Sequence, residues 1–327
     1  MYNSPEYQSI INIARTYIKE IADPQYNMKR PAGKQLGDAG EYGQAHMGYD
    51  KDSVLKKPIE DNPRPKGNIG PQEMTAMEKM DGTPGFPRLL NTDVKKTKDG
   101  YQGNIAISLA KGQTLADTMK KGMPEDKQKD AYKKIIRLRE KMHKKGIAHN
   151  DMHDRNLFVD DDNNPSVIDF GKANIDSLAA LGEALGTINV GDIGFEMSMK
   201  DMLGDKFDMK DPEMQKTLQK NYDSIAKELR GLQDEGESEE FDTFLKHSSG
   251  DPDQIDHEEI RSSVSKLQDN DYVMSLIDRF YDGVGENTTS DRMGRAVGDL
   301  KNIKSRLGRG GNLRRGETEV PDRNLDD

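Results

Sequence analysis

The chain has 327 residues, of which 32% are hydrophobic and 33% charged, and its formal net charge is -10. This length suits one bilobal domain or one domain with extensions. The absence of cysteine excludes disulfides, thiolate metal sites and a cysteine nucleophile, and six histidines disfavour a multi-histidine metal site. The acidic balance argues against nucleic-acid binding, because that binding depends on Lys and Arg replacing phosphate counterions. Any bound metal is therefore expected to have oxygen ligands.

The sequence predicts no membrane partner. No window approaches the roughly 18 consecutive apolar residues of a membrane span. Charged residues stand among the isoleucines of residues 1–23, which is not the pattern of a secretory signal. We therefore expect a cytoplasmic protein, with delivery to or expression in a host cell as an open alternative.

The first part of the chain changes from a helical to a strand-rich pattern. Ser4-Pro5 and the apolar spacing that follows predict an amphipathic helix that ends at Pro24. Glycines and short apolar runs then predict strands joined by turns. The expected strands are 53–56, 85–91 and 103–110, and a short helix is expected at Pro71–Met80.

The second part is predominantly helical. From Glu125 the apolar residues are spaced for one buried helix face, and Gly146 ends that helix. Two short apolar runs, 157–159 and 167–168, flank turn residues and predict a hairpin. Later helices are expected at 215–232, 258–280 and 293–307, with an acidic mobile connection at 234–256 and a disordered tail at 308–327. Strands first and helices second predict an α+β fold with a ligand cleft between two lobes.

Three polar side chains in residues 147–171, IAHNDMHDRNLFVDDDNNPSVIDFG, could serve phosphoryl transfer. That reaction needs charge neutralisation by cations, a cradle for phosphates and an oriented acceptor. Magnesium prefers oxygen ligands, so Asn156 and Asp169 are a sensible pair. Asp151, five residues before Asn156, could point at an acceptor hydroxyl. Each residue alone is more typical of a solvated loop, and the order of the three carries the argument.

The order of these residues resembles the catalytic and metal-binding loops of the eukaryotic-like protein kinase superfamily. His149-x-Asp151 is followed by Asn156 and, after the predicted hairpin, by Asp169-Phe-Gly. The resemblance implies a bilobal kinase fold that uses ATP and Mg²⁺. It also implies that Asp151 is the catalytic base, that Asn156 and Asp169 bind metal, and that His149 braces the loop.

The same resemblance assigns an ion pair to the strand-rich part. Lys56, on a predicted strand, is similar to the lysine that holds the ATP phosphates, and Lys57 is its rival. Glu73, seventeen residues on, stands where the family has the glutamate that holds this lysine. Glu78 is the alternative.

The remaining nucleotide contacts are assigned to main-chain groups. LGDAGEYGQA, residues 36–45, resembles the glycine-rich phosphate loop, with Gly37, Gly40 and Gly43 as candidates. Its spacing departs from the family pattern, because Asp38 stands where the first glycine is expected. The segment Ser108 to Ala110 resembles the hinge that binds adenine, although a plain buried strand fits the same residues.

Several departures bear on the type of kinase. Asn150 replaces the arginine that docks a phosphorylated activation loop in many relatives, so switching by loop phosphorylation is not expected. No Ala-Pro-Glu signal follows Gly171, and residues 190–203 resemble the central helix of the large lobe, with Asp192 supporting the catalytic loop. His153 resembles a feature of aminoglycoside and choline kinases.

These features predict a domain order and three competing functions. We expect an N-terminal helix at 1–30, a small lobe at 31–110, a large lobe at 111–232, a helical extension at 233–307 and a tail at 308–327. The leading function is a serine/threonine protein kinase that transfers phosphate from ATP to an unknown hydroxyl acceptor. A small-molecule kinase and an inactive pseudokinase scaffold are the alternatives.

Overall fold

A computed structural model describes residues 33–37, 43–48, 52–58, 71–97, 100–186, 211–232, 239–246 and 256–284. Several expectations fall outside these residues, namely the N-terminal helix, Gly40, Asp192, the helix at 293–307 and the tail. Among the helices that the structure describes, none has the length and apolar character needed to cross a membrane.

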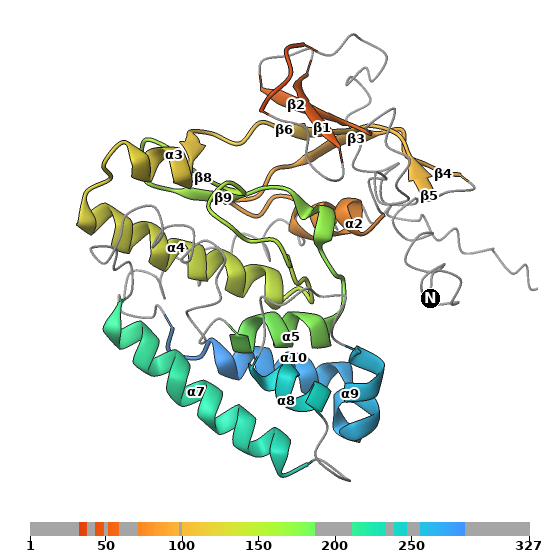
Figure 1. Cartoon of the computed structure of the whole chain (residues 1–327), viewed down its shortest axis with the longest axis vertical. Coiled ribbons are helices and arrows are strands. Elements are labelled where there is room, and N and C mark those ends of the chain that lie inside the picture. The colour runs from red at the N-terminus through yellow and green to blue at the C-terminus, as the bar shows by residue number, and fades with distance from the viewer. Residues whose placement is uncertain are drawn as a thin grey trace, which may run out of the picture. The chain divides into compact units, whose positions relative to one another are not determined.

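A four-stranded antiparallel sheet forms the small lobe, with the strand order β1-β2-β6-β3 (Figure 1). Its strands are β1 (Gln44–Met47), β2 (Ser53–Lys57), β3 (Leu89–Thr92) and β6 (Ile105–Ser108). Lys56 of β2 lies opposite Ala45 and Ile105, so the lysine sits in the interior of the sheet. Helix α2 (Pro71–Met80) buries Met74, Met77 and Met80 in the core beneath these strands.

Two further small sheets complete the strand content. Strands β4 (Lys95–Thr97) and β5 (Gly100–Gln102) form one hairpin. Strands β7 (Gln113–Thr114), β8 (Leu157–Val159) and β9 (Pro165–Val167) form the other sheet. Gly112 precedes β7 with φ +89°, and a Cβ atom there would lie 1.9 Å from the carbonyl oxygen of Val159. Only glycine therefore allows the chain to pass this close to β8.

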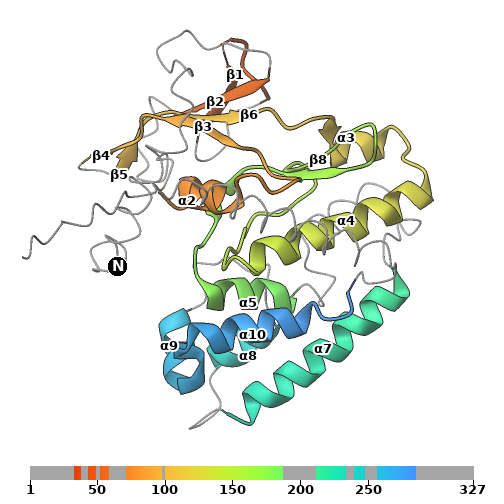
Figure 2. The same ribbon diagram turned by 180° about the vertical axis from the view of Figure 1, so that it is seen from behind.

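The large lobe is organised around helix α5 (Ser177–Gly186), in which every residue from Leu178 to Gly186 is buried. A helix that is apolar on all sides belongs inside a core. Helices α4 (Glu125–His143), α8 (Glu239–Lys246) and α10 (Asn270–Phe280) pack against it, and α7 (Pro212–Arg230) packs on α10 (Figure 2). Helix α3 (Leu115–Lys120) connects β7 to this lobe, and the Thr114 hydroxyl caps it.

The helical part differs from the sequence prediction in three ways. The expected mobile connection at 234–256 contains α8, whose Phe241, Phe244 and Leu245 are buried. The single helix expected at 258–280 is wrong, because the chain forms α9 (His257–Ser263), the 3-10 turn η4 (Ser265–Gln268) and α10, with Asp269 capping α10.

The third difference is helix α5, which the sequence analysis did not predict; it begins eight residues after Asp169 and occupies the centre of the core. The helix expected at 190–203 lies outside the described residues. Helices α8 to α10 belong to the helical extension that was expected at 233–307. They pack on α5 or on one another, and one continuous apolar core extends from α5 to Val284.

Candidate active site

Lys56 joins the two lobes through a buried ionic cluster. Its Nζ atom contacts Oε1 of Glu73 on α2, and it lies 2.8 Å from Oδ1 of Asp169, 113 residues further along the chain. Lys56 is 9% exposed and Glu73 is fully buried. We call Lys56, Glu73 and Asp169 the nucleotide-side cluster. It brings together three of the residues that the sequence analysis selected.

The charges of this cluster are unevenly balanced. Burial alone would lower the pKa of Lys56, but the two carboxylates raise it above its usual value, so the side chain is an ammonium. Burial opposes ionisation of Asp169 as well, but the Lys56 charge holds the pKa of this carboxyl below its ordinary value. Burial raises the pKa of Glu73, against the attraction of Lys56. One cation therefore serves two acidic groups.

His149 braces the catalytic loop as a neutral ring. Its Nε2 atom lies 3.0 Å from the carbonyl oxygen of Ile168, and the N–H of Asp151 lies 3.3 Å from Nδ1. The carbonyl can only accept and the N–H can only donate, so the proton is on Nε2. Burial lowers the pKa of His149, in agreement with the neutral ring. The ring also packs on Phe170 at 4.9 Å between centroids.

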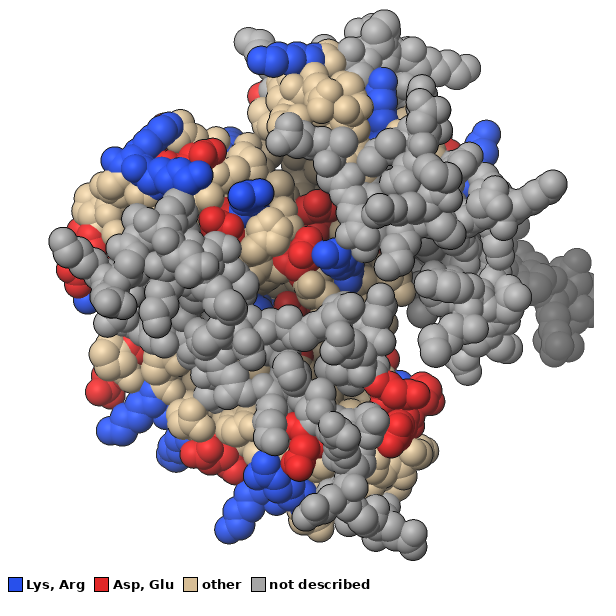
Figure 3. Space-filling model, viewed as in Figure 1, with Lys and Arg blue, Asp and Glu red and all other residues tan. Residues whose placement is uncertain are grey.

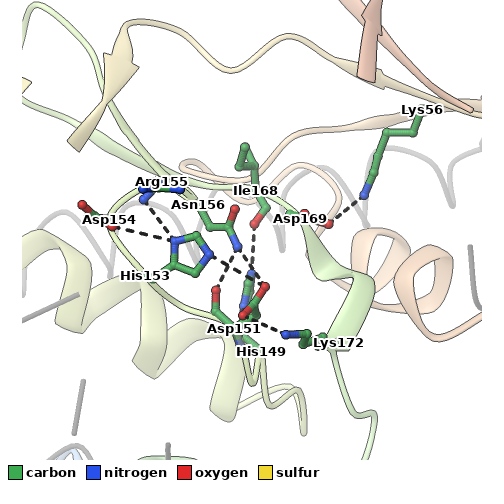
Figure 4. Close-up of polar contacts among 10 residues, drawn as sticks. All are labelled: Lys56, His149, Asp151, His153, Asp154, Arg155, Asn156, Ile168, Asp169 and Lys172. Atoms are coloured by element: carbon green, nitrogen blue, oxygen red, sulfur yellow. Dashed lines mark hydrogen bonds and ion pairs between the residues drawn. The ribbon is translucent and has the colours of Figure 1, made fainter. Parts of the chain in front are cut away.

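The Asp151 carboxylate is held at both oxygen atoms (Figure 4). The Asn156 amide donates to the main-chain oxygen of Asp151 at 2.9 Å and to Oδ2 at 3.3 Å. The Lys172 ammonium lies 3.4 Å from Oδ1. The Ile168 N–H donates to the carbonyl oxygen of Asn156 at 2.9 Å, and this bond places Asn156 beside the residue that precedes Asp169. The structure therefore gathers Asp151, Asn156 and Asp169 in one site.

A second buried cluster holds the catalytic loop from beneath. The Glu183 carboxylate of α5 accepts the N–H of His149 at 2.6 Å and the N–H of Asn150 at 3.3 Å. It also pairs with His143 at 3.0 Å and Arg139 at 3.5 Å. We call Arg139, His143 and Glu183 the support cluster. These partners overcome burial and lower the pKa of Glu183 to about 2, so it is ionised.

The sequence analysis expected Asp192, which lies outside the described residues, to support this loop; among the described residues Glu183 makes contacts of that kind. Sequence reasoning missed Glu183, although Leu178 to Gly186 contains no other charged residue. A carboxylate that a helix carries into the core must be paired, since an unpaired buried charge is very costly. The one charged residue of this apolar segment could therefore have identified Glu183 as a paired, buried carboxylate.

The two segments that the sequence analysis assigned to a phosphate loop and a hinge present main-chain groups. Two arms, Gly33–Gly37 and Gly43–Gly48, run antiparallel, with hydrogen bonds such as Leu36 N–H to Ala45 oxygen at 2.8 Å. Gly37 has φ +67°, at the point where the chain leaves the first arm. In the hinge, the Ser108 hydroxyl accepts the Arg88 N–H, and the Leu109 N–H donates to Asp52. Within the described residues the main chain of Ala110 makes no hydrogen bond.

The rival residues occupy other positions. Strand alternation places Lys57 on the opposite face of β2 from Lys56. Glu78 makes no ion pair with Lys56, and burial raises its pKa to about 7. His153 Nε2 lies 3.9 Å from Oδ2 of Asp151, so this histidine borders the site.

The oxygen ligands fit magnesium that arrives with a nucleotide. The described residues contain no group of three or more His, Cys, Asp or Glu side chains able to hold a metal ion alone. Mg²⁺ commonly binds through one or two carboxylates together with substrate phosphates and water. The Asp169 carboxylate accepts from Lys56 and from the main chain of Gly171, and its oxygens keep lone pairs for a cation. The amide nitrogen of Asn156 is turned to Asp151, which leaves the amide oxygen for a cation.

The space-filling view shows acidic and basic side chains side by side around a hollow between the strands and the helices (Figure 3). The chain segment from Asp169 to α5 is anchored by hydrogen bonds and an ion pair. Ala148 and Asn174 exchange two main-chain hydrogen bonds of 2.9 Å, and the Asn150 amide donates to the carbonyl oxygen of Lys172 at 3.1 Å. Arg261 holds both carboxylate oxygens of Asp176 at 2.7 Å. A loop anchored at these points holds its acidic groups in a fixed arrangement.

Residues 32–189 match the family model of the protein kinase domain. Over 113 residues, 34% of this chain, the sequence is 27% identical to the hormonally up-regulated neu tumor-associated kinase of Homo sapiens, and likewise to that of Mus musculus. The chain covers 15% of the length of these relatives. A solved structure, the Cydia pomonella granulovirus kinase PK-1, is similar at 21% identity over 50% of this chain and 57% of that chain, with a TM-score of 0.37.

Proposed function

Since residues 32–189 belong to the eukaryotic-like protein kinase superfamily, we propose that the chain is an active kinase that transfers the γ-phosphate of ATP, with Mg²⁺, to serine or threonine of a protein. The observation that carries this proposal is the ion pair of Lys56 with Asp169 at 2.8 Å. It joins a strand of the small lobe to the metal-binding loop, and a scaffold has no need to retain both charges in one buried cluster.

The site geometry supports separate roles for its residues. Lys56, oriented by Glu73, would bind phosphate oxygens from the sheet side, while Asp169 and Asn156 would hold Mg²⁺. Bound Mg²⁺ would neutralise charge on the phosphates. The Asp151 carboxylate would orient the acceptor hydroxyl and receive its proton. The main chain of Ala110 would bind adenine, because the N–H groups of Ser108 and Leu109 are already donated to Arg88 and Asp52. The loop with Gly37, Gly40 and Gly43 would cover the phosphates.

The short segment between Asp169 and α5 favours an enzyme that needs no loop phosphorylation. Lys56, Glu73 and Asp169 are already in contact, and the segment is anchored through Lys172 and Asp176. Asn150 also supplies no cation for a phosphorylated residue. His153, close to Asp151, favours the second candidate, a small-molecule kinase.

Incubation of the full chain with γ-labelled ATP and MgCl₂, alone and with cell extract, tests this proposal. We expect label on the chain itself or on extract proteins, and phosphoserine or phosphothreonine after hydrolysis. Label that enters only small metabolites would favour the small-molecule kinase. No transfer to any acceptor, together with nucleotide affinity that is the same with and without Mg²⁺, would favour the scaffold.

Two variants separate metal binding from transfer. Asp169→Asn should weaken Mg²⁺-dependent ATP binding, and asparagine tolerates the left-handed φ of +63° at this position. Asp151→Asn should preserve ATP affinity and lose transfer, because the base acts only on the acceptor. Asp126→Asn, on the exposed first turn of α4, is the matched control and should behave as the unaltered chain.

A further inference from the structure

A lysine that follows the metal-binding loop lies beside the acceptor base. The Lys172 ammonium is 3.4 Å from Oδ1 of Asp151, and its side chain is 34% exposed. Among the described residues it is the only lysine or arginine within 4.0 Å of this carboxylate. Lys56 is engaged on the other side of the site by Asp169 (Figure 4) and also pairs with Glu73. The two lysines therefore approach the site from different lobes.

The main chain of Lys172 is fixed close to Asp151. The Asn150 amide holds the carbonyl oxygen of Lys172 at 3.1 Å, and the short 3-10 turn Phe170–Lys172 follows Asp169 directly. These contacts place the Lys172 side chain on the Asp151 side of the site, where its ammonium lies 3.4 Å from Oδ1.

We propose that Lys172 is a catalytic residue that contacts the phosphoryl group during its transfer and neutralises part of its charge; this inference rests on the proposed kinase function. The segment after Asp169 would thereby supply a lysine beside Asp151. The loop that carries Asp151 places His153 near this carboxylate instead.

The charges of the reaction support this position. The acceptor oxygen forms a bond to the γ-phosphorus, its proton passes to Asp151, and the bond between the γ-phosphorus and the β,γ-bridging oxygen breaks to leave ADP. Negative charge on the transferring group is spread over three equatorial oxygens midway between donor and acceptor. Lys56 serves the donor side, and Lys172, next to the base, serves the acceptor side. A preorganised cation in such a position stabilises the transition state.

Single-turnover transfer measurements on the full chain test the proposal, with labelled ATP and MgCl₂ and with autophosphorylation or hydrolysis as the readout. Lys172→Met should lower the rate about 10²-fold, the usual effect of removing one such group. Affinity for a non-hydrolysable ATP analogue should stay within about twofold, because the contact forms mainly in the transition state. Affinity for ADP with aluminium fluoride, which mimics the transferring group, should fall.

Matched variants distinguish catalysis from a structural role. Lys172→Arg keeps the charge and should recover most of the rate, and Lys220→Met, an exposed lysine on α7, should leave the rate unchanged. Equal rates for Lys172→Met and the unaltered chain would overturn the inference while the proposed function stands. So would a loss of ATP-analogue affinity as large as the loss of rate. Absence of transfer from the unaltered chain would overturn both proposals.

Discussion

The nucleotide-side cluster and the support cluster are both ionic, but they differ in charge balance. In the first, Lys56 is the one cation that the described residues place on Glu73 and Asp169, and one oxygen of Glu73 has no hydrogen-bond partner among them. In the second, Glu183 has Arg139, a neutral histidine and two main-chain N–H groups. The first is short of positive charge, and the second is balanced.

From this difference we expect the nucleotide-side cluster to bind a ligand and the support cluster to fix the backbone. Burial of an uncompensated charge is costly, so a folded protein keeps one where a ligand completes the balance. A balanced cluster needs no ligand and serves to fix the backbone that it contacts. Glu183 fixes the N–H groups that precede Asp151, whereas Lys56 and Asp169 face a site that a cation and phosphates would complete.

The largest expected effect on stability comes from the support cluster. Glu183→Ala should lower the free energy of unfolding by about 3–5 kcal/mol, because it removes the carboxylate that pairs with buried Arg139 and accepts the N–H groups of His149 and Asn150. Urea denaturation followed by circular dichroism measures this change. Glu183→Gln, which keeps an acceptor oxygen for the loop N–H groups, should cost less. A loss under about 1 kcal/mol for both variants would contradict the supporting role.

The next largest effect is the loss, in acid, of the stabilisation that ionised Glu183 contributes to the folded chain. Its pKa is lowered to about 2 in the folded chain from an ordinary value of 4.5, so the unfolded chain binds the proton first. The stabilisation is therefore complete above about pH 4.5 and is lost as the pH falls towards 2, on the order of 3 kcal/mol. Denaturation midpoints measured across this pH range should fall less steeply for Glu183→Gln. Parallel curves for the two proteins would refute the assignment.

Much of the site could be predicted because its signals are local in the sequence. The bounds of α2 and β8 follow from Pro71 and from a turn-flanked apolar run, and the order of Asp151, Asn156 and Asp169 is readable within nineteen residues. The kinase fold expected from that order is confirmed by the match over residues 32–189. The functional roles of these residues stay predictions.

The rest depends on contacts between distant segments. Nothing close to Glu183 in the sequence identifies His149 as its partner, since the contact spans 34 residues. The stretch around α8 is acidic on average, and this composition predicted a mobile connection. It outweighed the helical spacing of Phe241, Phe244 and Leu245, which are buried. Lys172 gains its interest only when the fold brings it to Asp151, 21 residues earlier.

A smaller effect on stability is expected on the nucleotide side. Asp169→Asn should change the free energy of unfolding by less than about 1 kcal/mol, because Glu73 still neutralises Lys56 and the Asp169 side chain is 36% exposed. Thermal unfolding without nucleotide measures this change. Addition of ATP and Mg²⁺ should then stabilise the unaltered chain and not the variant. Strong destabilisation of ligand-free Asp169→Asn would mean that this cluster is structural too.

The smallest effect on stability is expected for an exposed ion pair. Its comparison with the Arg139–Glu183 pair tests whether burial causes the larger effect of the support cluster. Glu125 contacts Lys129 at 2.7 Å on α4, a shorter distance than that between Arg139 and Glu183. The Glu125 side chain is nevertheless 74% exposed. Glu125→Gln should lower the free energy of unfolding by about 0.5 kcal/mol or less, including its interaction with the helix dipole.

Added salt should erase this difference and leave the effect of Glu183→Ala nearly unchanged, since buried charges are screened much less. Similar salt sensitivity of both variants would indicate that water reaches Glu183, and the support cluster would then lose the feature that sets it apart.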